Sequence, residues 1–312
     1  MLSRIAESLF WIGRYVERAQ GTARLLSVHQ QLVIEDPYVT EESACTSLIR
    51  LMGCPESTPP TLDAVLDTMA YDPRSPWSIV YGITAARSNA RSAREVISSD
   101  LWECLNATWV ALPAGKFRAA DSYRFFRWVR DRTLLLSAIT DATMNRDLGW
   151  QFLTLGGALE RADMTARLVS SAATAGGSTP GGSITGWQSV MRSCGAQEAF
   201  VRAHSGLMAD AQAAQFLVLD HLFPRSVVYS LTQAEECLRS VGRESTGAGN
   251  SEAQRVLGRV RADLEYRRPG ELIETLPAEM AEVQDACAQA SDSIAGQYFS
   301  RTETVAWRAG QQ

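Results

Sequence analysis

The stretch Gly13-Arg-Tyr-Val-Glu-Arg-Ala-Gln-Gly-Thr-Ala-Arg-Leu-Leu-Ser27 is repeated in the second half of the chain as Gly156-Gly-Ala-Leu-Glu-Arg-Ala-Asp-Met-Thr-Ala-Arg-Leu-Val-Ser170. Both copies contain Glu-Arg, and both place another arginine seven residues after the glutamate. Repeats that keep the same order and nearly the same spacing indicate a tandem duplication. Two further blocks meet that condition, at offsets of 142 and 148 residues: 46–50 with 188–192, and 76–81 with 224–229.

The duplication divides the chain into two units of about 150 residues. We expect a first α-helical repeat over residues 1–144 and a second over residues 145–312. A chain that is 46% hydrophobic and 21% charged has the balance of a globular protein, with enough apolar material for a core. The two halves are expected to superpose, with Gly13 on Gly156.

Apolar periodicity predicts helices throughout the chain. Apolar residues recur at steps of three and four from Ser3 to about Val33, which indicates one long amphipathic helix with Ser3 as its N-cap. Ser75-Pro76 is expected to supply the N-cap and first residue of another helix. No segment alternates apolar and polar residues between turn signals. The fold class is therefore all-α, a tandem duplication of a roughly six-helix unit packed into one helical bundle. The expected helices span 3–33, 41–53, 61–70, 76–97, 99–109, 119–143, 146–174, 185–195, 197–221, 224–241, 251–267 and 270–298.

Charge and residue usage exclude several classes of function. The net charge of −5 and the single lysine, Lys116, argue against a nucleic-acid partner, because neutralising phosphates requires a surplus of basic residues. The first residues carry charges where a signal peptide would be apolar. No run of about 18 uncharged apolar residues occurs elsewhere. We therefore expect a cytoplasmic protein with no membrane partner.

Metal and cofactor chemistry find little support in the sequence. The six cysteines are scattered without a Cys-x-x-Cys pair, which is typical of small buried hydrophobic residues in a chain of this length. The three histidines, His29, His204 and His221, show neither zinc nor di-iron spacing. We expect no bound metal and no cofactor.

Two Gly- and Ser-rich segments, 175–183 and 243–251, interrupt the helical pattern. Neither follows a predicted strand or carries a phosphate-binding glycine signature, so both are interpreted as linkers. We expect them to be poorly ordered or to project from the surface, because they contain too few apolar residues to pack.

The repeated helix leaves its charged residues without partners in the same helix. Glu17 and Arg24 are two turns apart, about 10 Å along the axis, which is too far for the ion pairs that form at i,i+4. One interpretation pairs the copies reciprocally, Glu17 with Arg167 and Glu160 with Arg24, so that both glutamates are buried. The alternative places the same groups around a central cavity that binds a carboxylate, an amine or a metal.

Four segments carry a resemblance, in order along the chain: Ser3-Arg-Ile-Ala-Glu-Ser-Leu-Phe-Trp-Ile-Gly-Arg-Tyr-Val-Glu-Arg-Ala19, Arg87-Ser-Asn-Ala-Arg-Ser-Ala-Arg94 with Ser99-Asp-Leu-Trp-Glu-Cys-Leu-Asn106, Leu155-Gly-Gly-Ala-Leu-Glu-Arg-Ala-Asp163, and Phe223-Pro-Arg-Ser-Val227. Together they resemble the bacterial alpha-E family, which is named for its helical content and its Glu-Arg motif. The resemblance covers nearly the whole chain. One departure is Gly157, which stands where the family's usual pattern has a basic residue, as Arg14 does in the first half. A strictly symmetric pair of sites is therefore not expected.

The resemblance implies a role in amide chemistry. Members of the family are encoded beside, or fused to, a circularly permuted ATP-grasp amide ligase and a transglutaminase-like protease. These two proteins are therefore the implied partners, and a peptide is the implied substrate. The residues that carry over from the family motif are Glu17, Arg18, Glu160 and Arg161, with Arg24, Arg167, Asn89 and Arg91 as secondary candidates.

Three functions remain as hypotheses. The first is a helical subunit or partner of an ATP-grasp amide ligase in a bacterial peptide-synthesis or peptide-modification system. The second is an enzyme in its own right, in which Glu17 or Glu160 acts as a general base while arginines hold a peptide carboxylate. The third is a purely structural scaffold. A closed ion-pair core would favour the partner or the scaffold, whereas a solvent-connected cavity with unpaired charges would favour the enzyme.

Overall fold

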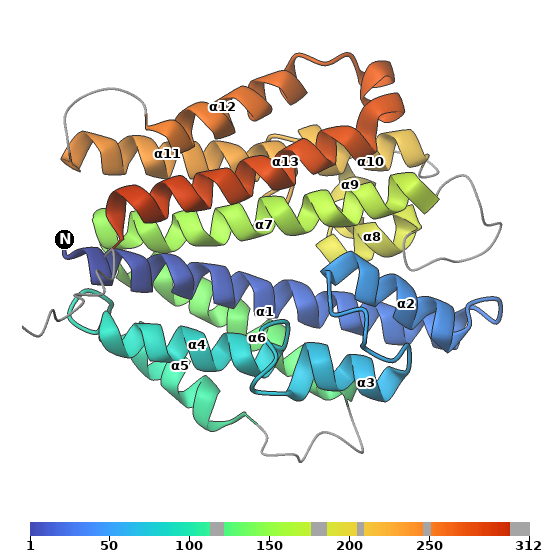
Figure 1. The fold of residues 1–312 in the computed structure, drawn as a ribbon, viewed down its shortest axis with the longest axis horizontal. Coiled ribbons are helices and arrows are strands. Elements are labelled where there is room, and N and C mark those ends of the chain that lie inside the picture. The colour runs from blue at the N-terminus through green and yellow to red at the C-terminus, as the bar shows by residue number, and fades with distance from the viewer. Residues whose placement is uncertain (113–121, 176–185, 205–208, 246–250, 300–312) are drawn as a thin grey trace, which may run out of the picture.

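The computed structural model describes residues 1–112, 122–175, 186–204, 209–245 and 251–299. All regular secondary structure in these ranges is helical, which confirms the all-α fold class (Figure 1). The Gly- and Ser-rich segments lie outside the described residues, apart from their ends. The elements are α1 Ser3–Glu35, α2 Glu41–Met52, α3 Leu62–Leu66, the π-helical turn η1 Asp67–Tyr71, α4 Ile79–Ser92, α5 Ser99–Val110, α6 Ser122–Thr143, α7 Leu148–Ala175, α8 Trp187–Cys194, α9 Gln197–Ala203, α10 Asp210–Leu219, α11 Val227–Ser245, α12 Glu252–Glu265 and α13 Pro269–Tyr298.

Two long helices form the centre of the molecule. α1 and α7 lie side by side, with α4 and α5 beyond α1 and with α11 and α12 beyond α7 (Figure 1). α4 and α6 pack on α1, and α11 and α13 pack on α7. Corresponding contacts in the two halves are what two copies of one helical unit would produce. The duplication itself, and the division at residue 144, stay predictions.

The central helices approach each other closely at two glycines. A Cβ atom added to Gly13 would lie 2.0 Å from the carbonyl oxygen of Leu153, and one added to Gly156 would lie 2.0 Å from that of Phe10. Real side chains do not fit at such distances, so backbone packs against backbone at this crossing. The two glycines therefore fix where α1 and α7 cross, and with it the residues that meet on either side.

Serine side chains begin the helices α4 and α11 in the same way. Ser78 Oγ accepts a hydrogen bond from the Tyr81 backbone N–H at 3.0 Å and donates to the Asp72 carbonyl. Ser226 Oγ accepts from the Tyr229 N–H at 3.1 Å and donates to the Asp220 carbonyl. The predicted cap at Ser75 is therefore wrong, because its hydroxyl donates to the Thr68 carbonyl instead. The side chain of Ser3 likewise makes no capping bond, since α1 begins at Ser3 itself with Leu2 before it.

The single helix expected over 197–221 is also wrong, because α9 ends at Ala203 and α10 begins at Asp210. His204 leaves the helical conformation with φ −127° and ψ 118°. Its ring stacks on Phe200 with centroids 4.4 Å apart and meets Phe216 edge-on. Aromatic packing at this point outweighs the helical propensity of the local sequence.

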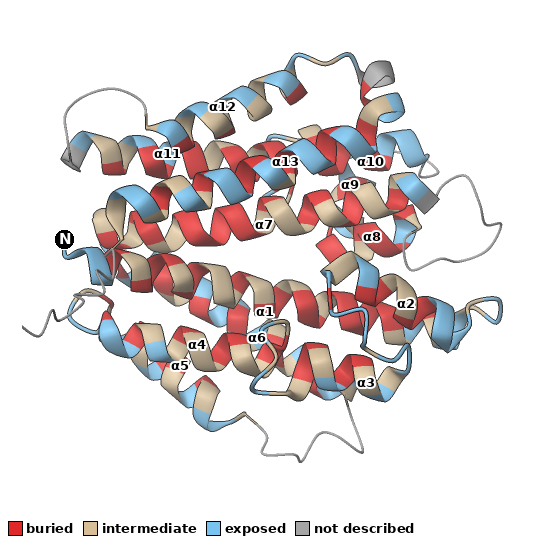
Figure 2. Ribbon diagram, viewed as in Figure 1, coloured by how far each residue is buried: buried red, intermediate tan, exposed pale blue. Residues whose placement is uncertain are grey.

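The buried residues lie on the helix faces that turn toward neighbouring helices (Figure 2). The largest fully buried side chains come from both halves of the chain and include Phe10, Phe125 and Leu155. All six cysteines are buried and free, in keeping with their interpretation as small core residues. Among the helices of the described ranges, none combines the length and the apolar character that crossing a bilayer requires.

Burial of His29 makes the stability of the fold depend on pH. His29 is 1% exposed, and its Nδ1 has no hydrogen-bond partner. Burial lowers the pKa of His29 to about 4, whereas the unfolded value is about 6.5. The unfolded chain therefore binds more protons between these pH values, so the stability conferred by the neutral ring is present above pH 6.5 and is lost as pH falls through 4.

We expect about 3 kcal/mol of unfolding free energy to disappear across this window, measured by urea denaturation at a series of pH values. His29→Leu should flatten the profile between pH 6.5 and 4. His221→Gln serves as the control, because the side chain of His221 is 65% exposed, and it should leave the profile unchanged. A wild-type profile without this decline would contradict the argument.

Candidate functional site

Glu17 lies at the centre of the first ion-pair cluster. Its side chain is 8% exposed and faces two arginines from the other half of the chain. Arg161, on α7, donates from Nη2 to Oε2 at 2.9 Å. Arg225, in the turn before α11, donates from Nη1 to Oε1 at 2.7 Å. Both carboxylate oxygens are therefore engaged by charged donors, the strong form of hydrogen bond.

Glu160 forms the matching cluster, with two arginines of α1. The residue is 3% exposed. Arg18 donates to both of its oxygens, from Nε at 2.5 Å and from Nη2 at 2.9 Å. Arg14 Nε forms a further ion pair at 2.7 Å. Each glutamate of a Glu-Arg pair thus binds the arginine of the other pair.

The prediction that Glu17 and Glu160 are buried and paired across the two halves is confirmed, but the predicted partners are wrong. Arg167 donates from Nε to Asp163 at 2.9 Å within its own helix. Arg24 forms no ion pair within the described ranges. The reason is geometric. The crossing at the two glycines places the two Glu-Arg pairs at the same level along the helices. Arg24 and Arg167 lie two turns further along, about 10 Å from that level, so they do not reach the glutamates.

The two clusters differ in a way that follows from Gly157. Arg14 reaches Glu160, whereas Gly157, the corresponding residue on α7, has no side chain to bring to Glu17. Arg225 supplies the second guanidinium there instead. In the sequence repeat Arg225 aligns with Trp77, so the first half has no equivalent. The sequence prediction missed Arg225. The repeated Pro-x-Ser block has Trp77 in the first half and Arg225 in the second, and this difference could have identified Arg225.

Electrostatics hold both glutamates in the ionised form. Burial alone would raise the pKa of Glu17, but the charges and hydrogen bonds of Arg161 and Arg225 outweigh it and lower the pKa to about 2. For Glu160 burial is likewise outweighed by Arg14 and Arg18, and its pKa is lowered. A carboxylate that holds its charge so strongly is a weak base near neutral pH. Neither glutamate is therefore poised to accept a proton.

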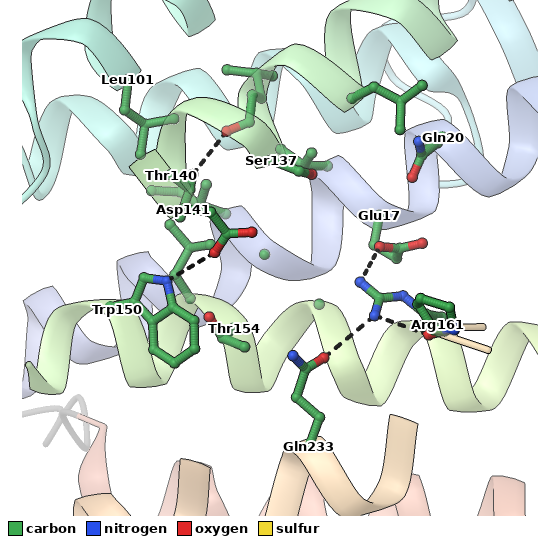
Figure 3. A pocket seen from close by; sticks show the side chains of 18 of the residues that line it. Glu17, Gln20, Leu101, Ser137, Thr140, Asp141, Trp150, Thr154, Arg161 and Gln233 are labelled. Carbon is green, nitrogen blue, oxygen red and sulfur yellow. Dashed lines mark hydrogen bonds and ion pairs between the residues drawn. The ribbon is translucent and has the colours of Figure 1, made fainter. Parts of the chain in front are cut away.

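A pocket of about 420 Å³ lies beside Glu17, between α1, α5, α6, α7 and α11. Figure 3 shows Trp150 and Asp141 at one end and Glu17, Gln20 and Arg161 at the other. Gly157 lies in the wall, so the space that Arg14 takes beside Glu160 stays open beside Glu17. The other polar residues that line the pocket are Ser137, Thr140, Thr154, Arg225, Tyr229 and Gln233.

The polar groups of the pocket are partly bonded to one another. Trp150 Nε1 donates to Asp141 Oδ1 at 3.3 Å. Arg161 Nη1 donates to Gln233 Oε1 at 3.3 Å and to the Pro224 carbonyl at 3.2 Å. Arg161 Nε, in contrast, is buried without a partner. The pocket can therefore offer donors at the Glu17 end and an acceptor at the Asp141 end.

The remaining sequence candidates lie away from this pocket. Asn89 Nδ2 donates to the Ala85 carbonyl within α4, and Arg91 is exposed. The structure brings Glu17, Glu160, Arg18 and Arg161 together and leaves these two on α4. In the ranges that the structure describes, no three His, Cys, Asp or Glu side chains lie close enough to hold a metal ion.

Comparisons with known proteins place these residues in a wider group. The sequence model of the Alpha-E family, described as a predicted alpha-helical domain with a conserved ER motif, matches residues 1–299. Similar proteins include an uncharacterized protein of Mycobacterium bovis and another of Mycobacterium tuberculosis, each 26% identical over 310 residues, with 90% of this chain and 34% of the relative covered. The chain thus spans about a third of the length of these relatives. No solved structure matches.

Proposed function

The chain belongs to the Alpha-E family, and on that premise we propose that it is a cytoplasmic helical subunit or partner of a bacterial ATP-grasp amide ligase. The ligase forms amide bonds on a peptide, and this chain binds the ligase without taking part in the bond-forming step. The Glu-Arg clusters hold α1 and α7 in one arrangement, so that the surface offered to the ligase keeps its shape.

The double pairing of each buried glutamate is the observation that carries this proposal. Each glutamate is bound by two guanidiniums, and the pKa of Glu17 is lowered to about 2. Buried ion pairs of this kind fix the register of packed helices more than they add stability. The relatives are about three times as long as the part they share with this chain, which fits a helical unit that works beside other domains.

Reconstitution with the ATP-grasp ligase encoded beside this protein tests the proposal. The two proteins are purified separately, mixed, and run on a size-exclusion column to detect a complex. The ligase is then supplied with ATP and candidate peptides, with and without this chain, and products are followed by mass spectrometry. We expect co-elution and an amide product whose formation depends on the chain. Separate elution together with unchanged ligase activity would refute the partnership.

The second candidate function is an enzyme that acts on peptide amide or amine groups. The pocket beside Glu17 favours it, because about 420 Å³ is large enough for a small ligand and the lining combines charged and polar groups. The low pKa of Glu17 opposes it. This hypothesis requires that the purified chain alone convert a peptide, and it requires an open pocket.

Gly157→Arg distinguishes the two functions. A Cβ atom at position 157 would lie 3.8 Å from the Gly13 carbonyl oxygen, an ordinary contact distance, so the first carbon of a side chain fits. We expect the new guanidinium to extend into the pocket toward Glu17, as Arg14 extends toward Glu160. A partner that acts through its surface should keep its effect on the ligase, whereas turnover by the chain alone should be abolished. Gly157→Ala is the matched control, because it leaves most of the pocket open.

A further inference from the structure

Next to the Glu17 cluster lie two arginines, Arg24 and Arg130, that form no ion pair within the described ranges. Arg24 follows Gln20 by one turn of α1, and Arg225 donates from Nη2 to Gln20 Oε1 at 2.5 Å. Helix α6, which carries Arg130, packs on α1. The guanidinium of Arg24 lies over Gly195, where Nη1 would be 2.7 Å from an added Cβ atom. Two helices and a turn thus bring three guanidiniums to one place, where the charges of Arg225 and Arg130 act on Arg24.

The positive charge at this place is not balanced. Neither Arg24 nor Arg130 forms an ion pair within the described ranges, and the nearby carboxylate, Glu17, is shared between Arg161 and Arg225. The charges of Arg24 and Arg130 are therefore left beside a carboxylate that already binds two other guanidiniums. The carboxyl end of α8 beside Gly195 contributes a partial negative charge of roughly half a unit, which is too little to neutralise them.

The hydrogen-bond donors here are also unsatisfied. The Nε atoms of Arg24 and Arg130 and the Nε2 atom of Gln20 are buried and make no hydrogen bond. Gln20 is 2% exposed, and the bond from Arg225 to its oxygen fixes which end of the amide is the nitrogen. Buried donors of a folded protein nearly always have partners, so three orphaned donors in one positive region indicate an absent acceptor.

The electrostatic state of Arg24 agrees with this arrangement. Burial, together with the like charges of Arg225 and Arg130, lowers the pKa of Arg24 to about 10, against the opposing effect of Glu17. An anion would remove this repulsion. Arg225 and Gln20 also line the pocket beside Glu17, so the arginine group adjoins a cavity that can hold the rest of a ligand.

We propose that Arg24, Arg130, Arg225 and Gln20 bind the oxyanion group, phosphate or carboxylate, of a small ligand. The geometry suits such a group, because guanidiniums bind planar carboxylates and phosphates through paired N–H donors and the amide of Gln20 adds a neutral donor. The inference is independent of the proposed ligase partnership, since it concerns binding by the purified chain alone.

Isothermal titration with inorganic phosphate and with glutarate, each at constant ionic strength in chloride, tests the site. We expect saturable binding of at least one of the two probes. Tighter binding of phosphate identifies a phosphoryl ligand, and tighter binding of glutarate identifies a carboxylate ligand. Arg24→Gln and Arg130→Gln should each weaken binding about tenfold or more, the loss expected for a charge-assisted hydrogen bond. Arg259→Gln, on the exposed face of α12, is the control and should bind as the wild type does.

The thermal stability of the same variants separates a ligand site from a structural one. Because Arg24 has no counter-ion, Arg24→Gln should leave the melting temperature of the free protein unchanged or raise it. A structural role would instead lower the melting temperature strongly. The proposal is overturned by the absence of saturable binding of both probes, by unaltered binding in Arg24→Gln, or by destabilisation of this variant comparable to that of Glu17→Gln.

Discussion

Replacing Glu17 with glutamine is expected to destabilise the fold by roughly 3–5 kcal/mol, the range for removing one partner of a buried ion pair. The substitution keeps the shape of the side chain but leaves Arg161 and Arg225 without the carboxylate that both of them bind. The free energy of unfolding is measured by urea denaturation. Glu252→Gln is the control, because the side chains of its surface pair with Arg255 are 65% and 67% exposed, and it should change stability by less than about 1 kcal/mol.

A double-mutant cycle identifies the partner. Arg161→Gln alone should also destabilise, but Glu17→Gln with Arg161→Gln should cost less than the sum of the single changes. Glu17→Gln with Arg167→Gln should instead be additive, because Arg167 pairs with Asp163. Coupling to Arg167 in place of Arg161 would contradict the structure. If Glu17 were a catalytic base, Glu17→Gln would leave the melting temperature nearly unaltered and abolish turnover, so stability and activity together decide its role.

Gly156→Ala is expected to destabilise the protein by about 3 kcal/mol, the upper part of the range for overpacking a tight contact. The added methyl carbon would lie 2.0 Å from the Phe10 carbonyl oxygen and 2.9 Å from its carbonyl carbon, so α1 and α7 have to separate. Backbone atoms, unlike the tip of a flexible side chain, cannot move aside cheaply. Gly13→Ala meets the Leu153 carbonyl at the same distance and should behave alike.

Two other helical glycines give a matched control for this prediction. Cβ atoms added to Gly242 and Gly296 would have no neighbouring atom within 4 Å. Alanine at either position should therefore be neutral or stabilise by up to about 1 kcal/mol, the difference in helix propensity. All four variants are compared by urea denaturation. Equal effects at Gly156 and Gly242 would show that the central helices do not pack backbone to backbone.

The Glu-Arg motif was recognisable from the sequence, and so was the burial of its glutamates. The repeat placed two identical charged pairs on two long amphipathic helices, and a pair of this kind that is written twice and flanked by apolar residues is expected in a core. The three- and four-residue spacing also predicted α1 and α7 to within two residues at each end. These features depend on local periodicity, which can be determined from the sequence alone.

The site itself depended on contacts that no local pattern contains. The sequence predicted Arg167 and Arg24 as partners, whereas the structure pairs Glu17 with Arg161 and Arg225. The sequence also did not predict a pocket at Gly157, or that Arg24 would lack a counter-ion. Which residues of two helices meet is set by where their axes cross, and Gly13 and Gly156 set that crossing by allowing backbone contact. Periodicity along a chain determines which face of a helix is buried, but only the packing of one helix on another determines what that face touches.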